Sequence, residues 1–264
     1  MKSGDIGAQV GDLQRRLYTN GYKVEETNVY DERTVAVVRQ LQARAGLVDD
    51  GKFGPKTDAY LRGSETGHLL KQRDLVNAAN RLGVDLPSVM AVNEVESTGS
   101  GFIEPGVPKI LFERHVFWQR LRARGIDPAP LAQKYPGTVN QKRGGYAGGR
   151  SEYTRLHVAL QINRDAAWES ASWGAFQIMG YHWETLGFDS VQAFVEAMRS
   201  GEAAQLDSFA AFILADPNLH RALKGRKWST FARIYNGPAY AENLYDVKLS
   251  RAYSRFADML QAAA

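Results

Sequence analysis

Apolar residues recur at helical spacing through the first sixty residues of the chain. Val10, Leu13 and Leu17 lie on one face of a predicted first helix. A second helix with the same spacing is predicted to begin after Asp31, as its N-terminal cap, and to end near Gly46. A third, shorter helix follows. The pattern therefore predicts a small helical module at the start of the chain.

Two of these helix starts resemble each other. Residues 30–34 and 53–57 each contain an aromatic residue, a turn or capping residue, a basic residue and a Thr that enters the helix. Residues 62–67 have no hydrophobic periodicity and contain two glycines, which is typical of a short linker. We therefore expect a module over residues 1–63, a linker over 64–73 and a second domain over 74–264.

The second domain is predicted to be mostly helical, and one of its helices carries an unusual carboxylate. Leu86, Val89 and Val92 form the apolar face of this helix, and Glu96 falls on the same face. Residues 97–101, rich in Gly and Ser, end the helix directly after it. An ionised carboxylate on a buried face is unfavourable unless it is paired or functional. Apolar surroundings raise the pKa of a carboxyl group towards neutrality, which suits a general acid.

Two later segments carry uncharged polar groups that could contact a substrate. In Ser172–Gly180, Gly174 allows close backbone approach, Gln177 supplies an amide, and Trp173 offers a face on which a sugar ring can stack. The segment 232–238 places Tyr235 and Asn236 at a predicted helix end, before a turn. These residues are candidates for a substrate site beside Glu96.

Composition removes several alternatives. The 264 residues include no cysteine, which excludes disulfides, thiolate metal sites and cysteine nucleophiles. The five histidines form no pair at metal-binding spacing, which argues against a zinc amidase. A net charge of +4 suits an anionic partner, such as cell wall, nucleic acid or lipid, without choosing among them. No apolar segment reaches the roughly 18 residues of a membrane helix, and the first residues do not form a secretory signal.

Residues 1–63 resemble the three-helix peptidoglycan-binding domain found at the ends of many wall hydrolases. The resemblance covers almost the whole module in the expected order and implies binding of glycan or stem peptide in a shallow groove. The matching residues are Val10, Leu13, Gln14, Leu17, Gly21, Tyr22, Thr34, Val37, Leu41, Gln42, Gly46, Leu47, Asp50, Gly51, Phe53, Gly54, Thr57 and Leu61.

The second domain resembles lysozyme-like enzymes. Glu96-Ser97, the motif from Ser172 to Gln177, and Tyr235-Asn236-Gly237 occur in the order seen in goose-type lysozymes and soluble lytic transglycosylases. Longer strings, among them residues 93–97, 109–115, 235–238 and 243–246, resemble the N-acetylmuramidase domain of modular phage endolysins, over roughly residues 74–262. The resemblance implies a mostly α fold: a small three-helix peptidoglycan-binding domain and a larger lysozyme-like α catalytic domain with minor β structure.

The same resemblance implies roles for individual residues. Glu96 would protonate the leaving glycosidic oxygen during hydrolysis of the β-1,4 bond between N-acetylmuramic acid and N-acetylglucosamine. The residues expected to position the acid or to bind the sugars are Ser97, Ser172, Trp173, Gln177, Tyr235 and Asn236. The expected partner is bacterial peptidoglycan, with no metal, organic cofactor, nucleic acid or stable membrane insertion, and the chain is expected to be a monomer.

The second carboxylate of such a mechanism is less clearly marked. An inverting hydrolase needs a base about 6.5–9.5 Å from the acid, and a retaining one needs a closer nucleophile. Glu113, which follows the apolar run 110–112, is the candidate; the alternative is a buried partner of Arg114 or of another basic group. Weaker candidates are Glu152, Asp165 and Glu169. A transglycosylase would need no second acid.

Other possibilities stay open at this point. The glycine-rich stretch 143–150 lacks the ending of a phosphate-binding loop, and we interpret it as a mobile loop that could cover the cleft. A lytic transglycosylase, an N-acetylglucosaminidase or chitinase, and a non-catalytic wall-binding or virion protein are the competing functions. By analogy with endolysins, we expect synthesis in a host cytoplasm, release through a pore made by another protein, and lysis by attack on the wall.

Overall fold

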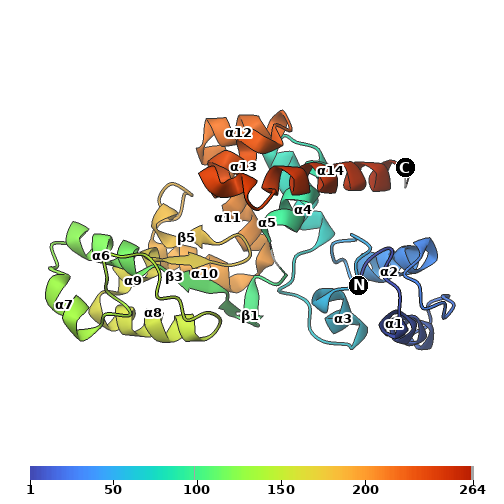
Figure 1. Cartoon of the computed structure of the whole chain (residues 1–264), viewed down its shortest axis with the longest axis horizontal. Helices are drawn as coiled ribbons and strands as arrows, with labels where there is room; N and C mark the ends of the chain where they lie inside the picture. Colours follow the sequence, from blue (N-terminus) through green and yellow to red (C-terminus); the bar gives the residue numbers. More distant parts are fainter. Residues whose placement is uncertain (98, 263–264) are drawn as a thin grey trace. The chain divides into compact units, whose positions relative to one another are not determined.

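The computed structural model describes residues 1–97 and 99–262. Thr98, in the loop predicted after Glu96, and Ala263 and Ala264, at the end of the expected second domain, lie outside the described residues. The chain is mostly helical, as predicted, with two small sheets (Figure 1). It divides into two compact units. Unit 1 is Met1–Glu94 with Val247–Ala264, and unit 2 is Val95–Asp246.

The first three helices of unit 1 confirm the helices that the hydrophobic pattern predicts. They are α1 (Ala8–Thr19), α2 (Glu32–Arg44) and α3 (Pro55–Leu61). Asp31 caps α2, because its Oδ1 accepts a hydrogen bond of 2.8 Å from the Thr34 N–H. The helices enclose one apolar core, formed by Val10, Leu13, Leu17, Tyr22, Val24, Tyr30, Val37, Val38, Leu41 and Phe53.

The sequence repeat corresponds to a repeated hydrogen-bond arrangement. Gln14, buried on α1, donates from Nε2 to the hydroxyl of Thr34 (2.9 Å) at the start of α2. Gln42, buried on α2, donates in the same way to the hydroxyl of Thr57 (3.2 Å) at the start of α3. Each glutamine Oε1 also accepts from backbone N–H groups, of Thr27 and Asn28 for Gln14 and of Gly51 for Gln42. The glutamine side chains, each held by a threonine, therefore supply hydrogen-bond partners to backbone groups of the loops between successive helices.

Unit 1 also contains α4 (Gln72–Leu82), α5 (Leu86–Glu96) as far as Glu94, and α14 (Tyr245–Gln261) from Val247 onward. Tyr253 on α14 donates to Asp85 Oδ2 at 2.9 Å, and Arg255 pairs with Glu94. The sequence pattern of residues 240–260 predicts a closing helix, and in the structure this helix begins later, at Tyr245. Residues Pro238–Ala241 form a short 3-10 helix (η2) after Gly237, whose positive φ of 82° ends the preceding helix.

Unit 2 is built around a small antiparallel sheet of order β3-β4-β5. Its strands are β3 (Ile110–Phe112), β4 (Ala171–Trp173) and β5 (Ile178–Met179). A hairpin of β1 (Phe102–Glu104) and β2 (Val107–Pro108) precedes it. The helices are α6 (Arg114–Ala123), α7 (Ala129–Lys134), α8 (Ser151–Ile162), α9 (Arg164–Glu169), α10 (Val191–Ser200), α11 (Glu202–Ala215), α12 (Pro217–Lys224) and α13 (Trp228–Asn236), with a 3-10 turn η1 at Gly180–His182.

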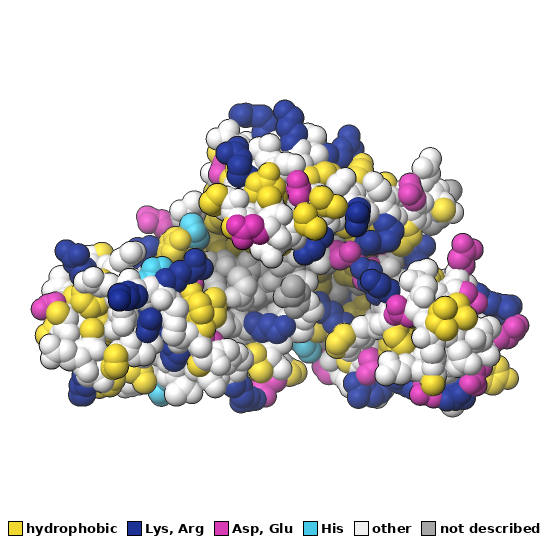
Figure 2. All heavy atoms as spheres, viewed as in Figure 1, with side chains coloured by type: hydrophobic (Ala, Val, Ile, Leu, Met, Phe, Trp, Pro, Cys, Tyr) yellow, Lys and Arg dark blue, Asp and Glu magenta, His cyan; other side chains and the backbone are white. Residues whose placement is uncertain are grey.

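Charged side chains are dispersed on the face of the molecule that Figure 2 shows. On the face drawn in Figure 2, lysine and arginine side chains are spread over both units among acidic side chains. None of the helices in the described part of the chain is long and apolar enough to cross a membrane.

Candidate active site

Glu96 lies at the end of α5, half-buried, as the sequence predicts. Asn236, the last residue of α13, donates from Nδ2 to Glu96 Oε1 at 3.0 Å. These two residues are 140 positions apart, and both belong to unit 2. The structure thus brings together the expected acid and one of its expected positioning residues.

Burial raises the pKa of Glu96 to about 7, while the hydrogen bond from Asn236 lowers it. Loss of hydration penalises the carboxylate more than the neutral acid, so burial exceeds the effect of one amide contact. A carboxyl group with a pKa near neutrality is partly protonated at neutral pH and can donate a proton to a leaving group.

The Tyr235 side chain is held in place beside this site by a hydrogen bond and by ring packing. Its hydroxyl donates to the Phe176 carbonyl at 2.9 Å, and its ring packs edge-on against Phe209 with centroids 5.2 Å apart. Burial and the neighbouring carboxylate of Glu96 raise its pKa well above the ordinary tyrosine value. A neutral phenol held in this way fixes the end of α13, and therefore Asn236, against the segment that follows β4.

That segment is ordered by its own polar side chains. Ser172 donates to Gln177 Oε1 at 2.8 Å, and Gln177 Nε2 donates to the Gly174 carbonyl at 2.8 Å. Gly174 has a φ of 75°, and Gln177 has a positive φ of 50°, which is uncommon for a residue with a side chain. Hydrogen bonds within the turn hold this conformation, so Ser172 and Gln177 shape the turn.

Trp173 differs from its expected role. Its side chain is fully buried, and its Nε1 donates to the Trp168 carbonyl at 3.1 Å. A side chain without exposed surface offers no face to a sugar ring, so Trp173 packs beneath β4 in place of the expected stacking contact. Ser97 follows Glu96 directly and is half-buried.

Two residues of α11 support the site and were missed in the sequence. Glu202 Oε1 accepts from the Gly101 N–H at 2.7 Å, in the loop after Glu96. Gln205 Oε1 accepts from the Ala175 N–H at 2.8 Å, and its Nε2 donates to the Met198 carbonyl. Both side chains are almost fully buried. The available signal was two polar residues three positions apart, Glu202 and Gln205, at the start of a largely apolar helix.

A pocket of about 410 Å³ adjoins this turn in unit 2. Its walls come from the loop after Glu96, from β3, from the glycine-rich stretch and from the turn at residues 174–177. The lining residues are Ser100, Ile103, Lys109, Ile110, Leu111, Gly148, Gly149, Gly174, Ala175 and Gln177. The pocket is large enough for a sugar-sized group. Glycines in two of its walls leave the backbone accessible to a ligand.

Glu113 comes directly after β3 and is buried. Both of its carboxylate oxygens accept from the Tyr146 hydroxyl, at 2.9 and 3.0 Å. His115 Nδ1 lies 3.2 Å from the carboxylate, and an Arg143 nitrogen lies 3.7 Å from it. These contacts are those of the structural alternative, with Arg143 and His115 as basic neighbours in place of Arg114. A role for Glu113 as catalytic base stays a prediction.

The three weaker carboxylate candidates all contact arginines. Glu152 is fully buried and pairs with Arg155 at 2.7 Å. Asp165 lies 3.2 Å from the exposed Arg164, and Glu169 lies 2.9 Å from Arg124. Their contacts therefore resemble structural ion pairs.

The glycine-rich stretch is held at both ends. Arg114 Nε donates to the Lys142 carbonyl at 2.8 Å before it, and Glu152 Oε1 accepts from the N–H groups of Ala147 (2.6 Å) and Gly148 (3.0 Å) within it. These contacts fix the stretch against α6 and α8. Its predicted movement as a cover for the cleft stays a prediction.

Comparisons with known families agree with this geometry. The family model of the N-acetylmuramidases matches residues 85–257, and that of a putative peptidoglycan-binding domain matches residues 6–61. The chain belongs to the N-acetylmuramidase family. It is accordingly a glycoside hydrolase, with a peptidoglycan-binding domain at its N-terminal end.

Solved and curated relatives extend the comparison. The crystal structure of Burkholderia AP3 phage endolysin is 50% identical to this muramidase with a TM-score of 0.93, covering 98% of this chain and 99% of that one. N-acetylmuramoyl-L-alanine amidase CwlL of Bacillus licheniformis is 38% identical over 64 residues, 23% of this chain and 18% of the amidase. A probable N-acetylmuramoyl-L-alanine amidase of the same organism is 33% identical over 76 residues, 22% of its length. The chain thus spans only about a fifth of these curated relatives.

A metal centre of the amidase type is not formed by the described residues. Among residues 1–97 and 99–262, no three or more His, Cys, Asp or Glu side chains gather in a group that could hold a metal ion.

The pKa of Glu96 predicts the pH dependence of the muramidase. Only the protonated acid donates, so kcat/KM is expected to fall about tenfold per pH unit above pH 7. The same shift affects stability. Because the folded state raises the pKa above its ordinary 4.5, the contribution of Glu96 to the free energy of unfolding decreases as pH rises from about 4.5 to about 7. A pH–rate profile on soluble glycan fragments checks the first part, and thermal unfolding across the same pH range checks the second.

Asn236→Ala tests the cause of this pKa. Removing the amide that lowers the pKa of Glu96 is expected to move the alkaline limb to higher pH, while the maximal rate falls because the carboxyl loses its orienting contact. Ser229→Ala on the same helix is the control, since its hydroxyl donates to Asp246. An unmoved limb in Asn236→Ala would contradict the assignment of the limb to Glu96.

Proposed function

We propose that this muramidase hydrolyses the β-1,4 bond between N-acetylmuramic acid and N-acetylglucosamine in bacterial peptidoglycan, with Glu96 as the general acid. The observation that supports this most directly is the half-buried Glu96 carboxyl, whose pKa is about 7 and which Asn236 contacts at 3.0 Å. The family match and the likeness to a phage endolysin support the substrate class.

In this mechanism the protonated Glu96 donates its proton to the glycosidic oxygen as the bond to the anomeric carbon breaks. A water molecule then completes the hydrolysis at that carbon. The buried surroundings of Glu96 keep it protonated before the reaction, and Asn236 stabilises the carboxylate that remains afterwards. Glu113, as the base that activates the water, stays part of the proposal to be tested.

The test is mass spectrometry of the products from purified peptidoglycan, with and without borohydride reduction. Reducible N-acetylmuramic acid ends are the expected result. Ends with 1,6-anhydro-muramic acid would mean intramolecular attack without water, and would remove the need for Glu113 as base. Reducible N-acetylglucosamine ends would move the cut to the other glycosidic bond, and uncut strands would contradict the proposal.

The physiological setting follows as part of the same proposal. An enzyme with this reaction and a wall-binding domain would cause lysis by acting on the wall of a bacterial host. Synthesis in the host cytoplasm and release through a pore made by another protein remain expectations from the resemblance to endolysins. Lysis from outside and from within can be compared by adding the purified protein to cells with intact and with permeabilised outer membranes.

A further inference from the structure

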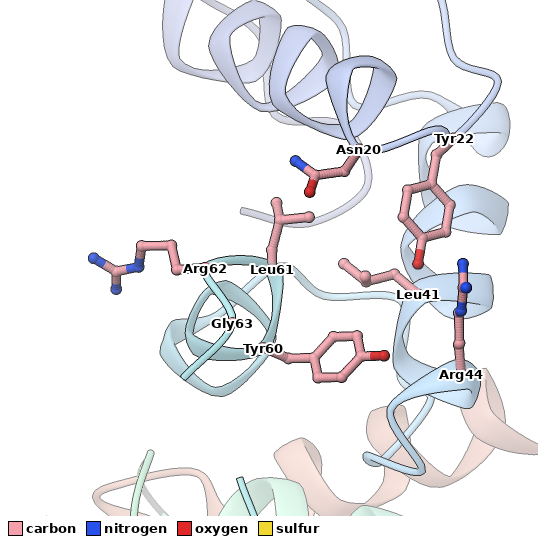
Figure 3. A pocket seen from close by; sticks show the side chains of 8 residues that line it. All are labelled: Asn20, Tyr22, Leu41, Arg44, Tyr60, Leu61, Arg62 and Gly63. Atoms are coloured by element: carbon pink, nitrogen blue, oxygen red, sulfur yellow. The ribbon is translucent and has the colours of Figure 1, made fainter. Parts of the chain in front are cut away.

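A groove of about 530 Å³ lies in unit 1, between the end of α1, the last turn of α2 and the end of α3 (Figure 3). Leu41 and Leu61 provide its apolar surface. The full lining is Asn20, Tyr22, Leu41, Arg44, Tyr60, Leu61, Arg62 and Gly63. No carboxylate belongs to this set, and two of its eight members are arginines. The groove is therefore both apolar and positively charged.

Three polar groups at the groove lack partners within the described part of the chain. The hydroxyls of Tyr22 and Tyr60 and the guanidinium of Arg44 lie on the same side of the groove in Figure 3. Tyr22 is buried apart from 8% of its surface, and Tyr60 is half-buried against the core. Each of the three groups carries donor hydrogens, so together they offer donors to one acceptor-rich ligand.

The second arginine is different. Arg62 pairs with Asp58 at 2.5 Å, and in Figure 3 its side chain points away from the groove. The amide nitrogen of Asn20 likewise donates to the Arg16 carbonyl at 2.8 Å. Among the arginines that line the groove, Arg44 is thus the one that can pair with an anionic ligand. It lies at an exposed position at the end of α2.

We infer that this groove binds the stem peptide of peptidoglycan through a peptide carboxylate. The inference rests on the proposed function, since it takes the wall as the substrate. A guanidinium with two phenol hydroxyls matches a carboxylate, which accepts several hydrogen bonds and carries the opposite charge. Glycan strands present hydroxyls and acetamides, which are neutral, whereas the stem peptides carry the carboxylates. The leucine surface suits the methyl groups of small peptide side chains.

The experiment uses the full chain in the Glu96→Gln form, so that the wall is not digested during binding. Cosedimentation is measured with intact sacculi and with sacculi whose peptide carboxylates have been converted to neutral amides by carbodiimide coupling to methylamine. We expect binding to intact sacculi and at least about tenfold weaker binding to the amidated ones. Arg44→Ala is expected to weaken binding to intact sacculi about tenfold, and Tyr60→Phe by about threefold, with no change in unfolding temperature.

Arg33→Ala is the matched control. Arg33 is an exposed arginine at the other end of α2 and pairs with the exposed Glu25 at 2.8 Å, so this change removes the same charge from the same helix. Equal losses for Arg33→Ala and Arg44→Ala would overturn the inference, because general charge attraction would then explain binding. Equal binding to intact and amidated sacculi would also overturn it, in favour of the uncharged glycan as ligand.

Failure of this inference and failure of the proposed function give different results. If the wild-type chain releases the expected reducing ends but Arg44→Ala binds intact sacculi normally, only the groove assignment falls. If the wild-type chain leaves glycan strands uncut while its binding depends on Arg44, the groove assignment stands and the catalytic proposal falls.

Discussion

Glu96→Gln is expected to lower the rate of peptidoglycan cleavage by about a thousandfold or more, while the protein stays folded. General acid catalysis contributes roughly 10²–10⁴ to such rates, and a glutamine amide has no proton to donate at neutral pH. The variant keeps the volume of the side chain and an oxygen that can accept from Asn236. Above pH 7 it should unfold at a higher temperature than the wild type, because it removes a buried carboxylate. Turbidity loss of sacculi and calorimetry measure the two effects.

Glu94→Gln is the control for this experiment. Glu94 lies two residues earlier on the same helix, but its carboxylate pairs with Lys52 and Arg255. We expect its activity to stay within about twofold of the wild type, since partly exposed ion pairs contribute little. Near-normal cleavage by Glu96→Gln would contradict the catalytic assignment.

Glu152→Ala is expected to cost about 3–5 kcal/mol of stability and to lower the unfolding temperature by roughly 10 °C or more. Burial alone would raise the pKa of Glu152, but the N–H groups of Gly148, Phe112 and Ala147 and the guanidinium of Arg155 bring it below its ordinary value. The substitution leaves the buried Arg155 without its carboxylate and frees the backbone of the glycine-rich stretch.

The pH dependence and a control identify the cause of this loss. A carboxyl group with a lowered pKa stabilises the fold at neutral pH and loses that contribution as the pH falls below about 4.5. The difference between wild type and Glu152→Ala should therefore shrink in acid. Glu104→Ala removes an exposed partner of Arg150 and is expected to change stability by less than about 1 kcal/mol. A pH-independent difference for Glu152→Ala would point to lost packing instead of lost charge.

Local patterns predicted several helices and the half-buried position of Glu96 correctly. Periodicity and caps gave α1, α2 and α5, because these depend on residues within one or two turns of each other. The position of Glu96 on the apolar face of α5, directly before a loop, was sufficient to predict a half-buried carboxyl with a raised pKa.

The surroundings of the site depended on contacts that no local pattern contains. Trp173 is buried because β4 is the central strand of its sheet, which the sequence around it does not reveal. Glu202 meets Gly101 across 101 positions, and Tyr146 meets Glu113 across 33. A carboxylate on the buried face of a helix indicates that it has a hydrogen-bond or charge partner. Which residue is that partner depends on the tertiary packing.

The two ends of the chain belong to the same compact unit, and this limits how the protein can be recombined. A fusion that joins residues 1–94 to another enzyme at a single junction would leave α14 behind, and with it the Tyr253–Asp85 and Arg255–Glu94 contacts. Transplanting unit 1 intact would need two junctions, one near residue 94 and one near residue 247, with the new segment inserted between them.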